Sequence, residues 1–179
     1  QIGHHVIYSS PGLEPPAHLL DLIAEGKVGG VIIFGENVSD NLTTTIDNLQ
    51  NTYKQSPYYS DSALFIMTDK EGGKVRRLPG GPVESAKKIG QTANPEVAAT
   101  QMGKDAASTL ATYKNNVNLA PVLDVYREAG DFADASERSF SNSSRVVGTC
   151  GSAFISAQQS AGVIASAKHF PGLGAAGAG

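Results

Sequence analysis

Two carboxylates stand directly after an apolar run, in the segment Asp69-Lys70-Glu71-Gly72-Gly73. The two glycines allow the backbone to turn sharply, which would hold the Asp69 carboxylate at the mouth of a fold. A carboxylate in that position can accept two hydrogen bonds from a vicinal diol, the usual way to fix a sugar ring. The alternative is an Asp that caps the loop or the next helix. Glu71 is either a second site carboxylate or an ion-pair partner of Arg76 or Arg77.

A second pair of polar residues, Lys168-His169, follows another apolar run near the end of the sequence. A cation beside an imidazole suits hydroxyl binding and does not form a nucleophile and base couple. Arg138 lies in a stretch with few apolar residues, and local sequence alone makes it a surface residue. The four His and one Cys lack the spacing of metal ligands, so no metal site is predicted. The nucleophile motif Gly-x-Ser-x-Gly is also missing.

The elements that must position these groups alternate between short apolar runs and segments of helical period. The runs predict buried strands at 4–8, 28–34, 63–68, 117–122 and 163–167. Helices are predicted after Pro15-Pro16 and ending at Gly26, from a cap at Ser39 or Asp40, from Asn94-Pro95 with Val97, Met102, Ala106 and Leu110 inward, and from Ser143 or Ser144. This order indicates an α/β fold with a parallel sheet, either doubly wound or a (β/α) barrel. No Gly-x-Gly-x-x-Gly or P-loop supports a nucleotide cofactor.

Polar residues follow four successive predicted strands. They are Glu36 and Asn37 after the second, Asp69 to Arg77 after the third, Asp124 after the fourth, and Lys168 and His169 after the fifth. Both architectures build their binding sites at the carboxyl ends of parallel strands. We therefore expect these side chains to converge on one site.

Composition limits the partners of the chain. The 179 residues carry a net charge of −3 without a large Lys/Arg cluster, so nucleic acid is not a predicted partner. No apolar run approaches the ~18 residues of a membrane-spanning helix, so no membrane partner is predicted. Cys150, the single cysteine, excludes an internal disulfide and is either buried or paired outside this segment. Sequons at Asn37, Asn41 and Asn142, and a start at Gln1 without a leader, favour a secreted, glycosylated protein.

Five motifs together resemble the N-terminal barrel of glycoside hydrolase family 3, especially its bacterial-type β-N-acetylglucosaminidase branch. They occur in the order and at the spacing of the family, over residues 1 to 174. The motifs are Val28-Gly29-Gly30-Val31-Ile32-Ile33-Phe34, Asp69 through Arg77, Leu119 through Val125, Glu137-Arg138-Ser139-Phe140, and Lys168-His169-Phe170-Pro171-Gly172.

The resemblance implies a set of substrate-binding residues and no cofactor. Asp69 and Arg77 would hold hydroxyls of the terminal sugar, Arg138 would contact the same ligand, and Lys168 and His169 would bind the same ring. Asp124 matches a family Asp that is structural rather than catalytic. The family reaction is retaining hydrolysis through an Asp nucleophile that follows a later strand. No catalytic residue is therefore expected within this segment.

Two departures from the family pattern concern the acid/base group. Leu173 stands where the N-acetylglucosaminidase branch usually has a His, and the Asp of its Asp-x-His dyad falls on Gly179. The sequence thus leaves two readings open: a hydrolase of terminal β-linked sugars, with β-N-acetylglucosaminide preferred over β-glucoside, or a sugar-binding relative with weak or no activity.

Length arithmetic predicts that residues 1–179 are the N-terminal portion of one (β/α)8 barrel domain. Five strand and helix units in 179 residues scale to about 286 residues for eight, near the ~250 of such barrels. The other strands would lie outside this chain, and five strands alone would expose an apolar edge. The Gly/Ala stretch from Gly174 onward is a predicted nicking site, which would leave the remainder of the barrel on a separate chain.

Overall fold

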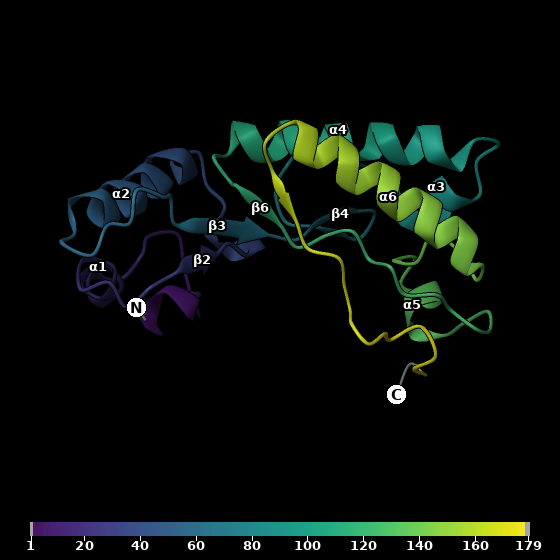
Figure 1. Cartoon of the computed structure of the whole chain (residues 1–179), viewed down its shortest axis with the longest axis horizontal. Coiled ribbons are helices and arrows are strands. Elements are labelled where there is room, and N and C mark those ends of the chain that lie inside the picture. Colours follow the sequence, from purple (N-terminus) through teal and green to yellow (C-terminus); the bar gives the residue numbers. More distant parts are fainter. Residues whose placement is uncertain (1, 178–179) are drawn as a thin grey trace.

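The computed structural model describes residues 2–177 and contains a five-stranded parallel sheet (Figure 1). Its order is β1-β2-β3-β6-β7, so strands that follow one another in this set are also neighbours in space. The strands are β1 (Ile7–Tyr8), β2 (Gly30–Ile32), β3 (Phe65–Thr68), β6 (Val117–Asn118) and β7 (Ile164–Ala165). The predicted α/β fold with a parallel sheet of five strands is confirmed, and each of the first four strands is followed by at least one helix.

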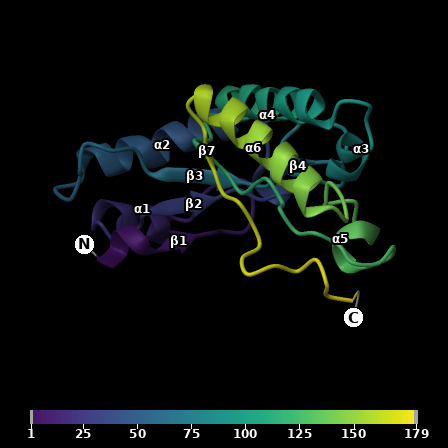
Figure 2. The same cartoon turned by 45° about the vertical axis from the view of Figure 1, so that its right-hand side comes forward.

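Helices connect each strand to the next, as parallel pairing requires. They are α1 (Ala17–Ala24), α2 (Leu42–Gln55), α3 (Ala86–Gly90), α4 (Pro95–Thr112), α5 (Phe132–Ala135) and α6 (Ser144–Ser160). Short 3-10 helices span Ile2–His5 and Gly35–Asn37, and an antiparallel hairpin of β4 (Lys70–Gly72) and β5 (Val75–Arg76) follows β3. In Figure 2, β3, β2 and β1 lie one below another, with α2 above them. No helix among the described residues is long and apolar enough to cross a bilayer.

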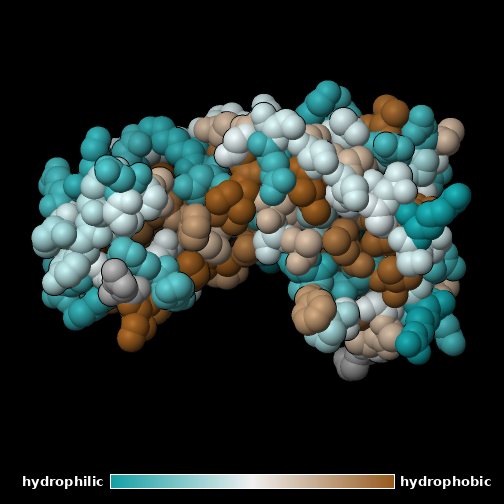
Figure 3. Space-filling view, in the orientation of Figure 1, coloured by the Kyte–Doolittle hydropathy of each residue, from teal (hydrophilic) through white to brown (hydrophobic). Residues whose placement is uncertain are grey.

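The two faces of the sheet differ in how far they are covered. Val31 and Ile66 belong to a buried cluster with residues of α1 and α2, including Ile23 and Leu49. On the opposite face, Ile7, Phe65 and Ile164 of β1, β3 and β7 are 42%, 43% and 46% exposed. Hydrophobic side chains gather near the middle of the view in Figure 3, where the outline is also notched. The sheet therefore has one helix-covered face and one partly open apolar face.

A second buried cluster joins α4 to α6, which packs against α4 at an angle in Figure 1. It includes Met102, Ala106, Val147 and Phe154. Gly103 permits this close approach, since a Cβ there would lie 2.5 Å from the backbone oxygen of Phe154. The predicted inward position of Val97 is wrong, because Val97 lies in the first turn of α4, away from the face formed by Met102 and Ala106, and is exposed.

Several predicted strands are shorter than expected. Residues 28–34, 117–122 and 163–167 keep only two or three strand residues each, with one further bridge between Val122 and Lys168. Pro121 has no amide hydrogen to donate to a neighbouring strand, which interrupts the pairing of 117–122.

The prediction of a strand from residue 4 is wrong, because Ile2–His5 form a 3-10 helix. Gly3 lies against the backbone of Gly26 and Lys27, and the His4 ring meets Tyr53 edge-on at 6.0 Å. This segment therefore packs at the rim of the sheet and does not pair with it.

The helix starts follow the predicted chemistry in part. Asn94 caps α4 by accepting a hydrogen bond from the Val97 amide, and Ser143 is the residue before α6, as predicted. The predicted cap of α2 at Ser39 or Asp40 is wrong, since Asn41 precedes the helix. The Ser39 hydroxyl instead accepts from the Asn41 amide within the preceding turn.

Candidate functional site

The hairpin after β3 places the two carboxylates of the Asp69 motif. Gly72 and Gly73 have φ values of +101° and +57°, which confirms the predicted sharp turn. The buried Asn118 side chain at the end of β6 accepts a hydrogen bond from the Lys70 amide at 2.9 Å and donates to the Lys70 carbonyl at 3.2 Å. The hairpin is thereby tied to the neighbouring strand, with Asp69 and Glu71 on either side of Lys70.

Lys168, which follows β7, lies between these two carboxylates. Its Nζ donates to Asp69 Oδ1 and contacts Glu71 Oε1, both at 2.7 Å. Asp69 and Lys168 are 99 positions apart in the sequence, and they meet because β3 and β7 run parallel in the same sheet. The predicted convergence of strand exits is therefore present at Asp69 and Lys168.

Arg138, in the loop before α6, binds Glu71 through two parallel hydrogen bonds. Its Nε donates to Oε2 at 2.8 Å and its Nη2 donates to Oε1 at 2.7 Å. The Glu71 side chain is only 5% exposed, so this ion pair is shielded from solvent. The hydrogen bonds to Glu71 raise the pKa of Arg138 above its usual value.

His169 completes the cluster and is oriented by a buried carboxylate. Its Nδ1 lies 2.7 Å from Asp124 Oδ2, and its Nε2 lies 3.4 Å from Arg138 Nη2. Asp124 is 2% exposed and accepts a second hydrogen bond from the Leu173 amide at 2.7 Å. Because the Asp124 carboxylate can only accept, the hydrogen bond places the N–H on Nδ1, and Nε2 is the imidazole nitrogen left for Arg138 or a ligand.

Arg77 is the outermost of the predicted site residues. Its side chain is 42% exposed, and its Nε lies 3.9 Å from Asp69 Oδ2. That contact is longer than a hydrogen bond, so Oδ2 keeps capacity to accept from a ligand. All five predicted residues, Asp69, Arg77, Arg138, Lys168 and His169, thus belong to one connected cluster.

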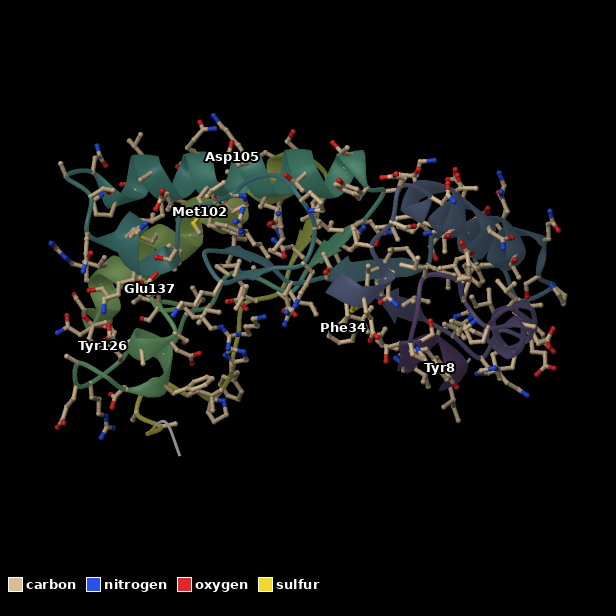
Figure 4. All side chains as sticks on the ribbon, turned by 180° about the vertical axis from the view of Figure 1, so that it is seen from behind. Tyr8, Phe34, Met102, Asp105, Tyr126 and Glu137 are labelled. Atoms are coloured by element: carbon tan, nitrogen blue, oxygen red, sulfur yellow. The ribbon has the colours of Figure 1, made fainter. Side chains whose placement is uncertain are left out.

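A pocket of about 240 Å³ adjoins the cluster. It is lined by Leu123, Asp124 and residues 167–172, and Phe170 is almost fully exposed beside it. Figure 4 views the molecule from behind, with Phe34, just beyond β2, near its middle and Tyr126 toward the end that carries α5. Carboxylate acceptors, three cationic donors and an imidazole beside a pocket form an arrangement that can bind a ligand rich in hydroxyl groups.

Of the two sequence interpretations of Glu71, a second carboxylate of the site agrees with the structure, and an ion pair with Arg76 or Arg77 does not. Glu71 pairs with Arg138 and Lys168, whereas sequence reasoning offered Arg76 or Arg77. A local pattern cannot reveal a pair separated by 67 residues. The Asp69 carboxylate likewise binds the side chain of Lys168, which follows a distant strand. Asp69 is therefore not a helix cap.

Lys70 was not singled out by the sequence and is fully buried. Its Nζ donates to the carbonyl oxygens of Leu78 and Gly80 at 2.5 and 2.9 Å. Burial, and secondarily the charge of Arg76, lowers the pKa of Lys70 to about 8. One feature of the sequence could have indicated this burial. Lys70 stands between two carboxylates in an extended segment, where neighbouring residues point to opposite faces, so Lys70 points away from the site.

The three predicted glycosylation sites differ in accessibility. Asn37 is buried, and its Nδ2 donates to the carbonyl oxygens of Ser10 and Gly12 at 2.8 and 2.7 Å. In this folded structure the Asn37 nitrogen that would carry a glycan is enclosed and already donates two hydrogen bonds. Asn41 and Asn142 are exposed, and glycans there remain a prediction.

The structure also shows the surroundings of Cys150 and of the candidate metal-ligating side chains. Cys150 is buried, and its Sγ lies 3.7 Å from the Pro95 carbonyl oxygen, which agrees with the buried alternative. Within residues 2–177, no three His, Cys, Asp or Glu side chains form a group that could hold a metal ion.

The N-terminal domain model of glycosyl hydrolase family 3 matches residues 8–179. The chain belongs to glycoside hydrolase family 3. Its match includes all the residues of the site cluster, from Asp69 to His169.

Relatives of this family 3 chain are longer than the chain itself. A protein of Arthroderma benhamiae described as an uncharacterized secreted glycosyl hydrolase is 55% identical over 176 residues, covering 98% of this chain and 50% of the relative. Beta-hexosaminidase A of Pseudoalteromonas piscicida is 35% identical, covering 89% of this chain and 27% of the relative. A family 3 β-N-acetylglucosaminidase structure from Paenibacillus sp. str. FPU-7 superposes with a TM-score of 0.86 at 29% identity, covering 97% of this chain and 33% of that one. The chain therefore spans half or less of the length of these relatives.

Proposed function

We propose that this chain supplies the sugar-binding part of a retaining glycosidase that removes terminal β-N-acetylglucosamine units. The observation that carries the proposal is the Asp69, Lys168, Glu71 and Arg138 cluster at the exits of the parallel strands. The hexosaminidase and β-N-acetylglucosaminidase names of two relatives support the substrate class.

The geometry favours recognition of a sugar ring by complementary donors and acceptors. Asp69 Oδ2 has only the 3.9 Å contact with Arg77, so it can accept from a hydroxyl pair of the sugar. Lys168 and His169 can donate to and accept from hydroxyls next to that pair. An Asp nucleophile and an acid/base group would come from the remainder of the polypeptide, as the retaining mechanism needs two such groups across the glycosidic bond.

The remainder of the barrel is also the partner that we propose for the open face of the sheet, whether on the same chain or on a nicked one. We further propose secretion, since a relative at 55% identity is described as secreted. Under this proposal Asn41 and Asn142 carry N-glycans and Asn37 does not. Glycopeptide mapping of the protein from a eukaryotic secretory host checks this, and a glycan on Asn37 or bare Asn41 and Asn142 would contradict it.

The substrate proposal is tested with the full-length protein that contains this chain. We expect hydrolysis of an aryl β-N-acetylglucosaminide with a kcat/KM well above that for the matching aryl β-glucoside. A higher kcat/KM for the glucoside would support glycosidase activity but would contradict N-acetylglucosamine as the preferred sugar.

A sugar-binding protein without hydrolysis is the second candidate, favoured by Leu173. This residue stands beside the cluster with an exposed apolar side chain, where a His would be able to transfer a proton. In the same assay, sugar binding without turnover of either glycoside would favour this candidate. Neither binding nor turnover would contradict both.

A further inference from the structure

We propose that Glu71 is a positioning residue that holds Lys168 and Arg138 in the geometry needed to bind the sugar, without touching the sugar itself. This inference rests on the proposed function of the same site. It assigns Glu71 a role different from that of Asp69, although both carboxylates come from one hairpin.

Glu71 contacts both cations through well-aligned carboxylate oxygens. Both of its carboxylate oxygens are used: Oε2 accepts from Arg138 Nε, and Oε1 accepts from Arg138 Nη2 and lies 2.7 Å from Lys168 Nζ. A bidentate pair fixes the plane of the guanidinium as well as its distance. Glu71 therefore sets the orientation of Arg138 and the place of Lys168 together.

Glu71 is also more buried than the groups that it holds. Its side chain is 5% exposed, against 16% for Asp69 and Lys168, 18% for Arg138 and 42% for Arg77. Glu71 therefore lies beneath the two cations that it contacts. A ligand entering from solvent meets the cations that Glu71 holds before it reaches Glu71.

The negative charge of Glu71 also balances the charges around it. Lys168 and Arg138 are two cations held near each other, and Asp69 bonds only Lys168 among these two. Without the Glu71 charge, the two cations would repel each other with one carboxylate between them, in a partly buried setting where such repulsion is poorly screened. The side chains would then leave the positions in which they face a ligand.

The experiment measures kcat and KM of the full-length protein on an aryl β-N-acetylglucosaminide, below its melting temperature. For Glu71→Gln we expect kcat/KM to fall at least tenfold, mainly through a higher KM, because binding groups are misplaced. Glu71→Asp keeps the charge but is one methylene shorter, so we expect an intermediate kcat/KM. Glu84→Gln is the matched control, since Glu84 pairs with Lys88 at the surface, and it should stay within about twofold of wild type.

A double-mutant cycle separates positioning from a general structural role. Because Glu71 acts partly through Arg138, the effect of Glu71→Gln should be clearly smaller in an Arg138→Met background, and the part that acts through Lys168 should remain. Full additivity of the two changes, or wild-type kcat/KM in a folded Glu71→Gln variant, would overturn the inference. If Glu71→Gln does not fold, Glu71→Asp decides, and a wild-type kcat/KM for it would overturn the inference as well. Wild-type protein that neither binds nor hydrolyses the sugar would instead contradict the proposed function.

Discussion

At the scale of single residues, the site combines groups that the sequence identifies with groups that only the fold reveals. Asp69, Lys168 and His169 could be predicted because polar residues at the ends of apolar strands have few structural reasons to be there. Arg138 could be predicted only through the family resemblance, because its loop gives no local sign of a site. The Glu71 and Arg138 pair and the Asp124 and His169 pair join residues 67 and 45 positions apart, so they needed the structure.

The buried amine of Lys70 makes the stability of the fold depend on pH. Its hydrogen bonds go to the carbonyl oxygens of Leu78 and Gly80 and not to a carboxylate. Its pKa is about 8 in the fold against 10.5 for the unfolded chain. Between these values the folded state has lost the proton and the unfolded state keeps it, so stability rises with pH. Below pH 8 both states are protonated and Lys70 adds no pH dependence.

The measurement compares the free energy of unfolding of wild type and Lys70→Met in urea at pH 7 and pH 10. We expect the advantage of wild type over the variant to grow by on the order of 2–3 kcal/mol at pH 10. Lys104→Met is the control, because Lys104 is exposed on α4. If the difference in the free energy of unfolding between wild type and Lys70→Met stays constant with pH, the pKa of Lys70 is not lowered in the fold.

At the scale of elements, the sequence predicts the order of strands and helices better than their ends. The apolar runs and the Asn94-Pro95 start identify the parallel strands and α4, because burial and capping act locally. Residues 2–5 do not form the expected strand, since contacts with Gly26, Lys27 and Tyr53 from distant segments decide their conformation. The β4–β5 hairpin is the element on which the site depends most, because it carries Glu71.

Gly72 is the position at which this hairpin is most sensitive. A Cβ there would lie 2.4 Å from the Glu84 carbonyl oxygen and 2.8 Å from Met102 Cε, and φ is +101°. Met102 extends from α4 in Figure 4. We expect Gly72→Ala to lower the free energy of unfolding by about 3 kcal/mol or more, since strain and steric overlap add.

Gly12→Ala is the matched comparison, because Gly12 has φ +78° and nothing within 4 Å of its would-be Cβ. Only backbone strain applies there, and a loss of about 1 kcal/mol is expected. Urea unfolding of both variants checks the difference. Equal losses for the two variants would mean that the hairpin tolerates a side chain at Gly72.

At the scale of the whole molecule, the open face of the sheet and the greater length of the relatives both fit a chain that forms part of a larger fold. Ile7, Phe65 and Ile164 remain nearly half exposed on one face, whereas the other face is covered by α1 and α2. The relatives contain at least as many residues again as this chain matches. The strand count and length of the sequence likewise fit only part of an eight-stranded barrel.

The account depends most on the claim that the strand-exit cluster binds the sugar, and Asp69 tests that claim directly. In the full-length protein, Asp69→Asn keeps the shape of the side chain but weakens its ability to accept from two hydroxyls. We expect kcat/KM for an aryl β-N-acetylglucosaminide to fall by about 30- to 1000-fold, the equivalent of about 2–4 kcal/mol. Asp105→Asn, an identical change at a surface position on α4 where Asp105 accepts from Gln101, should stay within about twofold of wild type. If the two variants have the same kcat/KM as wild type, the sugar does not bind at this cluster.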